Sequence, residues 1–250
     1  MRKVTKVSAL SPLKNQMVQG IIPAPSTIPS ENTNIHPTTI FLTSVEDIEK
    51  KFLESTGLNV DLSKYPLEND PNQQVITDKN KSDEHGEVFT PLWLVDDMLD
   101  RVDNKSWRDQ SLTTEDLCAG YGQFTVRMLR KKYSLLKNKF DLNRFLTETH
   151  LFIELQPNSC FHLLYTFGKD IRLLIGDASQ KSKLPDEVEN GIWVWSDTCG
   201  KWYDRTTKVK ALFDRYNLEG KSVKENAAKF EKEFKSLLAM FEDRKKNHGK

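Results

Sequence analysis

Four short apolar runs, separated by stretches with helical periodicity, constrain this chain more than any other feature of its sequence. The stretches at residues 122–136 and 157–168 carry apolar side chains at helical spacing. Strands that alternate with helices in this way are typical of βα units around a mainly parallel sheet. We therefore predict an α/β, Rossmann-like fold whose first strands are EDLCAG (115–120), HLFIEL (150–155), IRLLIGD (171–177) and GIWVWSD (191–197).

The segments on either side of this alternation differ from it in composition. Residues 1–40 are rich in Pro, Ser, Thr and Asn and lack sustained periodicity, which predicts a flexible N-terminal arm. Residues 41–200 are assigned to the α/β core with an N-terminal helical segment. Residues 201–250 are predicted to be a helical extension. Its last helix has an apolar stripe, which we expect to pack on the core or to form a homodimer contact: Ala228, Phe230, Phe234, Leu237, Leu238 and Phe241.

Two helix starts are marked in the N-terminal half. Residues 44–57 are predicted to form an amphipathic helix, with Ser44 as the N-cap and Gly57 as the stop. Thr90 and Pro91 have the residue types expected of an N-cap and a first helical position. The polar stretch between these helices is predicted to be a loop.

Composition excludes several classes of protein. The formal net charge is +1, so a nucleic-acid-binding face would have to be a local feature. The three cysteines are widely spaced and follow no zinc-ligand or disulfide pattern, so we expect no metal site and a reducing compartment. No window approaches the roughly 18 apolar residues of a membrane span, and no signal peptide is evident. We therefore expect a soluble cytoplasmic protein without a membrane partner.

The segment DLCAGYGQF, residues 116–124, is the strongest chemical signal in the sequence. Gly120 and Gly122 permit a tight turn between the first strand and the following helix, and they let a ligand approach the backbone. Asp116, beside that turn, could receive the cationic amine of a ligand. Glycines at strand ends are also common turn residues without a ligand, and that structural alternative stays open.

Two further acids follow the next two strands. Glu154 ends the second predicted strand, from which carboxylates in nucleotide-binding α/β folds hold ribose hydroxyls. Asp177 ends the third strand and could accept a hydrogen bond from an adenine amino group. Each acid could instead cap the next helix. However, three acids at successive strand ends all fall on the edge where open α/β sheets bind ligands.

These segments resemble the N6-adenine DNA methyltransferases of restriction and modification systems. GEVFTPLWLVDDML (86–99) resembles the GxxFTP motif that precedes their core, and DLCAGYGQF resembles their DPACGTGxF loop. The segments IEL (153–155) and GDA (176–178) resemble their second and third motifs. The resemblance implies an S-adenosylmethionine site and DNA as partner. It assigns the cofactor to Phe89, Thr90, Pro91, Asp116, Cys118, Gly120, Gly122, Phe124, Glu154, Asp177 and Ala178.

The sequence departs from the family at the fourth strand. Family members place there a polar residue, two prolines and an aromatic ring that stacks on the flipped base. Here Ser196 and Asp197 occupy the catalytic position, followed by Thr198 and Cys199, so the prolines and the ring are missing. Fewer residues remain after this point than the family's remaining strands and recognition region require. An active DNA adenine methyltransferase and an inactive binding module or subunit, acting through DNA or a protein partner, both stay open.

Two basic clusters are candidates for contact with phosphate groups. RKKYSLLKNK (130–139) and DRKKNHGK (243–250) are rich in Lys and Arg. Such runs on exposed helices mostly serve as solvated faces, which is the alternative here.

Overall fold

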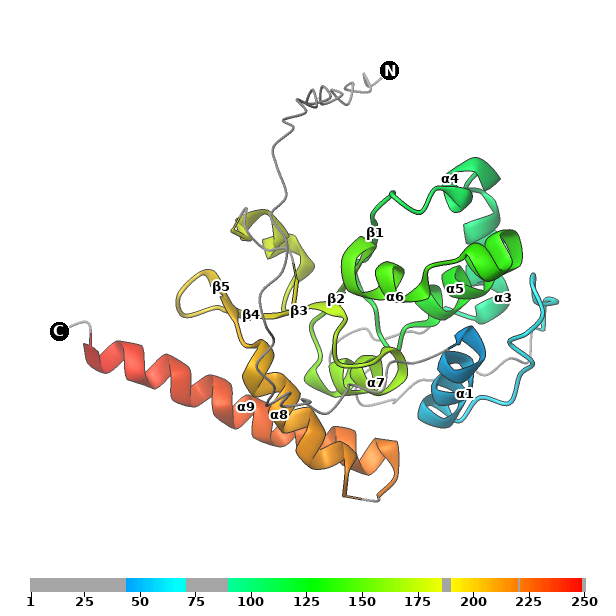
Figure 1. Ribbon diagram of the computed structural model, residues 1–250. Helices are drawn as coiled ribbons and strands as arrows, with labels where there is room; N and C mark the ends of the chain where they lie inside the picture. The colour runs from blue at the N-terminus through cyan, green and yellow to red at the C-terminus, as the bar shows by residue number, and fades with distance from the viewer. Residues whose placement is uncertain (1–43, 71–89, 186–189, 220, 249–250) are drawn as a thin grey trace, which may run out of the picture. The chain divides into compact units, whose positions relative to one another are not determined.

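The computed structural model describes residues 44–70, 90–185, 190–219 and 221–248 (Figure 1). The predicted arm at residues 1–40 lies outside these ranges, as does Phe89. The strands are β1 (Thr114–Asp116), β2 (His150–Glu154), β3 (Arg172–Ile175), β4 (Ile192–Ser196) and β5 (Lys201–Asp204). The α-helices are α1 (Val45–Thr56), α3 (Leu92–Asp100), α4 (Asn104–Arg108), α5 (Gln123–Leu136), α6 (Leu142–Arg144), α7 (Pro157–Phe167), α8 (Thr206–Asn217) and α9 (Val223–His248). Short helical turns are η1 (Lys137–Lys139), η2 (Phe145–Thr149) and η3 (Ala178–Lys183).

The predicted α/β fold with a mainly parallel sheet is confirmed. In the part of the chain that the structure describes, the sheet has five strands in the order β1-β2-β3-β4-β5. The first four are parallel, and β5 runs antiparallel to β4. The spatial order therefore follows the chain order. A doubly wound sheet instead reverses its strand order beside the first strand, where the ligand crevice opens; here β1 lies at the edge of the described sheet.

The C-terminal extension begins differently from the prediction. Residues 201–204 form strand β5 rather than helix, and only α8 and α9 match the helical expectation. Ser196 pairs with Lys201, and the amide of Gly200 donates to the carbonyl of Ser196 at 2.8 Å, which closes a tight hairpin. Gly200 has a φ of 59°, a left-handed conformation that glycine adopts without strain. A four-residue strand was too short to be recognised from periodicity.

The N-terminal helices follow their capping signals closely. Ser44 Oγ accepts a hydrogen bond from the amide of Asp47, and Gly57 ends α1 with a φ of 71°. The second helix begins one residue later than predicted. Pro91 is the N-cap of α3 rather than its first helical residue, and its carbonyl accepts from the amides of Leu94 and Val95. Thr90 therefore lies before the cap.

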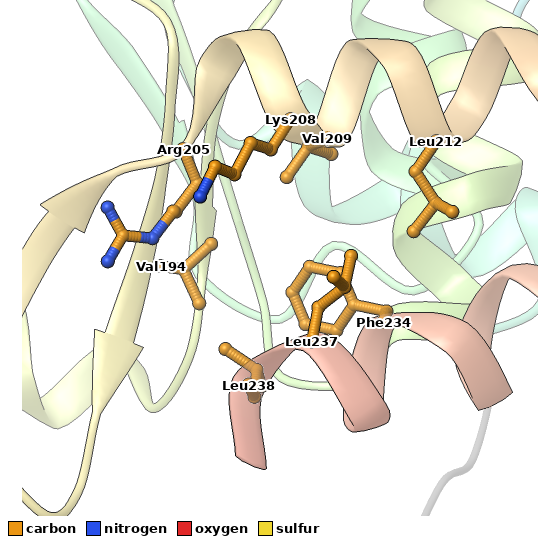
Figure 2. A pocket seen from close by; sticks show the side chains of 8 residues that line it. All are labelled: Val194, Arg205, Lys208, Val209, Leu212, Phe234, Leu237 and Leu238. Atoms are coloured by element: carbon orange, nitrogen blue, oxygen red, sulfur yellow. The ribbon is translucent and has the colours of Figure 1, made fainter. Parts of the chain in front are cut away.

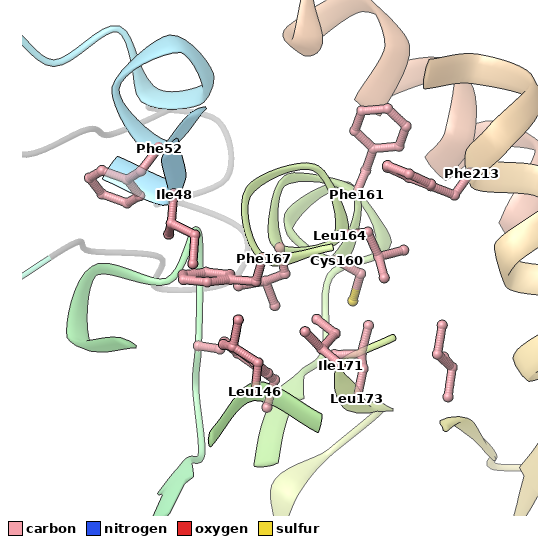
Figure 3. Packing of buried hydrophobic residues seen from close by; sticks show 14 of the residues in the cluster. Ile48, Phe52, Leu146, Cys160, Phe161, Leu164, Phe167, Ile171, Leu173 and Phe213 are labelled. Carbon is pink, nitrogen blue, oxygen red and sulfur yellow. The ribbon is translucent and has the colours of Figure 1, made fainter. Parts of the chain in front are cut away.

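Helix α7 is the centre of the main hydrophobic core. Figure 3 shows Phe161 of α7 facing Phe213 of α8, while Phe167 lies toward Ile48 and Phe52 of α1. Phe161 also contacts Phe230 of α9, with 5.5 Å between ring centroids. The apolar stripe of α9 thus packs on the core.

The composition of that stripe differs slightly from the prediction. Ala227, Phe230 and Phe234 are buried, whereas Ala228 is exposed. Leu237 and Leu238 are partly buried against the same cluster. The side chain of Phe241 lies outside the described side chains.

The cations of α5 point into the protein rather than toward solvent. Arg130 pairs with Glu49 of α1, and Lys131 donates to the carbonyl of Leu99 at 2.9 Å. The side chains of Arg130, Glu49 and Lys131 are all buried. Lys132 is also buried and donates to the carbonyl of Trp107 at 3.3 Å. These three cations of the first basic cluster are therefore unavailable to phosphate groups. The side chains of the second cluster, residues 243–250, are not among those described.

Arg127 of α5 and Asp96 of α3 form a fully buried ion pair. Arg127 Nε lies 2.7 Å from Asp96 Oδ1, and both side chains are 0% exposed. The guanidinium also donates to the carbonyls of Leu62 and Lys64, and Asp96 accepts from the amide of Leu67. The pair therefore fixes the loop after α1 against α3 and α5.

The neighbouring carboxylates Asp96 and Asp97 give a matched test of this ion pair. Asp97 also pairs with an arginine, Arg101, but both of those side chains are exposed. Asp96→Ala is expected to lower the free energy of unfolding by roughly 3–5 kcal/mol, because it leaves a buried guanidinium without its counter-charge. Asp97→Ala is expected to change it by less than about 1 kcal/mol. Urea denaturation of both variants measures the difference, and equal losses would contradict the role assigned to Asp96.

Candidate functional site

The turn between β1 and α5 is held by glycines and by backbone hydrogen bonds. The amide of Ala119 donates to the carbonyl of Ile153 in β2, and that of Gly122 donates to the carbonyl of Ala119. Gly120 and Gly122 have φ values of 53° and 91°. A Cβ atom on Gly122 would lie 2.3 Å from Cε2 of Phe167, so this glycine is needed for the contact between the turn and α7. Its role in the structure is packing, whether or not a ligand binds nearby.

Glu154 ties the ends of β1 and β2 together. Its Oε2 accepts from the amide of Gly120 and its Oε1 accepts from the amide of Gln156, both at 2.7 Å. The residue is buried. The Glu154 carboxylate therefore holds the turn after β1 close to the start of α7.

Asp116 is a buried acid of the candidate site with a raised pKa. Its side chain is buried, and Oδ2 lies 3.3 Å from Thr125 Oγ1, which donates to it. Burial raises the pKa of Asp116 to about 6, although the hydrogen bonds from Thr125 and from the backbone of Cys118 act in the opposite direction. Buried acids with raised pKa values are concentrated at functional sites, where a ligand supplies the missing counter-charge.

Asp177 has a different environment. It is exposed at the end of β3 and accepts a hydrogen bond from the amide of Ser179 at 2.8 Å, as the cap of η3. Hydrogen bonds from Ser179 lower its pKa. The neighbouring Ala178 is partly buried against the cluster formed by Leu151, Ile153, Leu174 and Trp202. The capping alternative that the sequence left open therefore describes the local contacts of Asp177.

The three acids nevertheless converge on one place. Cys118 is exposed directly after β1, and its pKa is raised first by burial and then by the charges of Glu154, Asp116 and Asp177. All three carboxylates are therefore close enough to act on one thiol. Parallel register explains this, because β1, β2 and β3 end at the same edge of the sheet. We call this edge, defined by Asp116, Cys118, Glu154 and Asp177, the acidic rim.

The remaining candidate cofactor residues are less directly placed. Phe124 packs on the cluster of Val95, Leu99, Trp107 and Met128, which joins α5 to α3 and α4. Thr90 and Pro91 are partly buried at the start of α3, which packs along α5.

The predicted catalytic residues Ser196 and Asp197 lie in the β4–β5 hairpin. Ser196 Oγ accepts from the amide of Cys199 at 3.3 Å, and Asp197 Oδ1 accepts from Trp195 Nε1 at 2.7 Å. Strands β2 and β3 separate β4 from β1. At the usual strand spacing, the hairpin is therefore about 14 Å across the sheet from the end of β1.

Sequence reasoning missed a polar side chain beside the glycine turn. Gln123 is the first residue of α5, and its side chain is only 6% exposed. Its amide nitrogen has no hydrogen-bond partner within the described part of the chain, which costs about 1–3 kcal/mol for a buried donor. Its place directly after Gly122 was the only available signal, since burial and satisfaction cannot be read from sequence.

An apolar hollow lies away from the acidic rim, between β4, α8 and α9 (Figure 2). Its cavity volume of about 20 Å³ is far below the roughly 300–1,000 Å³ of typical small-molecule sites. None of the candidate cofactor residues lines it. In the described ranges, no grouping of His, Cys, Asp and Glu is suited to a metal ion, and no described helix has the length and hydropathy needed to cross a bilayer.

Comparison of the chain with protein-family models, with curated proteins and with solved structures found no match. Fold and site therefore define only a class of protein, an α/β protein with a mainly parallel sheet and acids gathered at one edge.

The raised pKa of Asp116 makes a prediction about stability. The native carboxyl titrates near pH 6 and the unfolded one near 3.8, so between these values the native state binds more protons. The free energy of unfolding that Asp116 contributes therefore falls as pH rises through this window. Asp116→Asn removes the buried charge, so it is expected to stabilise the protein by about 2–3 kcal/mol at pH 7 and by much less near pH 4. Urea denaturation across this range measures the difference, and a difference independent of pH would contradict the raised pKa.

Proposed function

We propose that this chain binds S-adenosylmethionine at the acidic rim. The supporting observation is that Asp116, Glu154 and Asp177 lie at three successive strand ends and that their charges all raise the pKa of the Cys118 thiol. A nucleoside that carries a cationic amine and a sulfonium needs anionic and acceptor groups of this kind. The order of motifs in the sequence supports the same ligand.

The residues present fit such a ligand chemically. Asp116 would receive the cationic amine, Glu154 the ribose hydroxyls and Asp177 the adenine amino group. The unpaired amide nitrogen of Gln123 would donate to the ligand's carboxylate, which removes the cost of burying that donor. When bound, S-adenosylmethionine supplies an electrophilic methyl group.

Transfer of that methyl group to a DNA adenine is the activity that the resemblance implies, with Ser196 and Asp197 as the catalytic residues. One observation favours a second candidate, a binding module that holds the cofactor and acts through DNA or a protein partner without methyl transfer. Ser196 and Asp197 lie in a closed hairpin, and two strands, β2 and β3, separate β4 from β1. A base extruded near the hairpin would also lack the stacking ring of the family motif, worth about 1–3 kcal/mol.

Calorimetric titration with S-adenosylmethionine tests the cofactor site. Asp177→Ala is expected to weaken binding at least about tenfold, equivalent to 1.4 kcal/mol, because it removes the acceptor for the adenine amino group. Asp204→Ala is a matched control, since Asp204 Oδ1 accepts from the amide of Thr206 two residues later, just as Asp177 Oδ1 accepts from the amide of Ser179. Asp204 ends the antiparallel strand β5, so it lies beside the start of β4, at the opposite end of the strands from the acidic rim. Undetectable binding by the wild type, or equal weakening by both variants, would reject the proposed site.

Methyl incorporation into DNA separates the two candidates. With radiolabelled S-adenosylmethionine and DNA of mixed sequence, we expect cofactor binding without incorporation, because Ser196 and Asp197 make hydrogen bonds within the hairpin and lie far from the end of β1. Incorporation that Ser196→Ala abolishes would instead establish the transferase and reject the inactive module. Incorporation unaffected by Ser196→Ala would reject both the inactive module and the assignment of Ser196.

A further inference from the structure

A row of hydrogen-bonding side chains lies behind Asp116, outside the proposed ligand contacts. Thr125 Oγ1 of α5 is 3.3 Å from Asp116 Oδ2 and 2.9 Å from Nε2 of His150. On the other side of the imidazole ring, Nδ1 of His150 is 2.7 Å from Thr114 Oγ1. Asp116, Thr125 and His150 are buried, and Thr114 is partly buried at the start of β1. The row therefore runs from the acidic rim to the other end of the edge strand.

The direction of each hydrogen bond follows from the chemistry of the ionised carboxylate. An ionised carboxylate can only accept, so the single hydroxyl proton of Thr125 is donated to Asp116. Thr125 Oγ1 must then accept from His150, which places the ring proton on Nε2. In a neutral ring Nδ1 is left as an acceptor, and it takes the hydroxyl proton of Thr114. Every bond in the row thus points toward Asp116.

We propose that Thr114, His150, Thr125 and Asp116 form one directed hydrogen-bond chain, which reverses as a unit when Asp116 takes up a proton. His150 is then a positioning residue for Asp116, acting through Thr125. The relevance of this hydrogen-bond chain to ligand binding rests on the proposed function, in which Asp116 meets the ligand's cation. The existence of the hydrogen-bond chain does not depend on the proposed function.

The reversal conserves all atoms and adds one proton from solvent. Protonated Asp116 donates to Thr125 Oγ1, and the Thr125 hydroxyl turns to donate to Nε2 of His150. The ring proton moves from Nε2 to Nδ1, and Nδ1 then donates to Thr114 Oγ1. The imidazole stays neutral throughout and changes only its tautomer, through exchange of its ring proton with solvent.

The surroundings of His150 oppose a charged ring. Burial, then the charges of Arg172 on β3 and Lys132 on α5, lower the pKa of His150 to about 3. Phe145 stacks on the ring with 4.9 Å between centroids, and Phe152 meets it edge-on at 4.5 Å. A proton that enters the row under mildly acidic conditions therefore resides on Asp116 rather than on His150.

The surroundings of Asp116 set the conditions for the reversal. Glu154 and Asp177 contribute negative charge to the rim that they share with Asp116 and Cys118. A cationic ligand favours the ionised carboxylate and with it the forward direction of the chain. Binding of such a ligand is therefore expected to weaken as Asp116 becomes protonated.

Nitrogen-15 NMR of the histidine rings tests the hydrogen-bond chain in the whole protein without any ligand. Between about pH 8 and pH 5, the proton of His150 is expected to move from Nε2 to Nδ1 while the ring stays neutral. Carbon-13 spectra of the Asp116 carboxyl group should show its titration over the same range. His162 is an internal control, because its Nδ1 bonds to Ser55 and not to the chain, so its tautomer should not follow Asp116.

Two variants distinguish coupling through the hydrogen-bond chain from general effects of mutation. Thr125→Val removes the hydroxyl that joins His150 to Asp116, so the tautomer of His150 should no longer follow the Asp116 titration. Thr113→Val, at an exposed position next to Thr114, should leave the coupling intact. If Thr125→Val fails to fold, the wild-type spectra still decide. If the tautomer of His150 does not change while Asp116 titrates, or if the ring proton is on Nδ1 at pH 8, the proposed hydrogen-bond chain is wrong. Failure to bind S-adenosylmethionine would reject only the proposed function.

Discussion

The hydrogen bonds that Glu154 accepts from two backbone amides are the constraint on which the acidic rim depends. One amide belongs to Gly120 in the turn after β1, and the other belongs to Gln156 at the start of α7. A single buried carboxylate thus sets the path of the chain out of two neighbouring strands. The turn, the N-terminus of α5 and the position of Asp116 all follow from that attachment. Because Glu154 has this structural task, a ligand would share its carboxylate rather than receive it unpaired.

Local patterns in the sequence predicted the elements well and their arrangement less well. The second to fourth apolar runs correspond to β2–β4, and the caps of α1 lie at Ser44 and Gly57 as expected. The first run was placed too late in the chain: β1 (Thr114–Asp116) contains only Glu115 and Asp116 of residues 115–120, and the apolar residues of that run lie in the turn after the strand. Strand order was not predictable, because periodicity describes which face of a strand is buried and not which strand lies beside it. The hairpin was missed for a related reason: residues 201–204 were assigned to the helical extension, and only their pairing with β4 identifies them as a strand.

The candidate site shows the same division. The positions of Asp116, Glu154 and Asp177 at successive strand ends could be predicted, because parallel strands end at one edge. Their environments could not, since the burial of Asp116 and the exposure of Asp177 depend on how α5 and η3 pack. The separation between β1 and β4 matters most for function. It places the predicted cofactor and catalytic residues at different parts of one edge, which is why cofactor binding and methyl transfer are separate proposals.

The inward-pointing cations of α5 decide how little of the chain can fold alone. Each is satisfied by a different upstream segment: Arg127 by α3 and the loop after α1, Arg130 by α1 and Lys132 by the carbonyl of Trp107 in α4. A fragment beginning near β1 would retain the whole sheet and yet lose the groups that pair with these cations, and it would expose the apolar side chains that α1 and α3 cover. We therefore expect the sheet and the helices that precede it to fold as one unit, in which the earlier segments supply the carboxylates and carbonyls that the buried cations of α5 require.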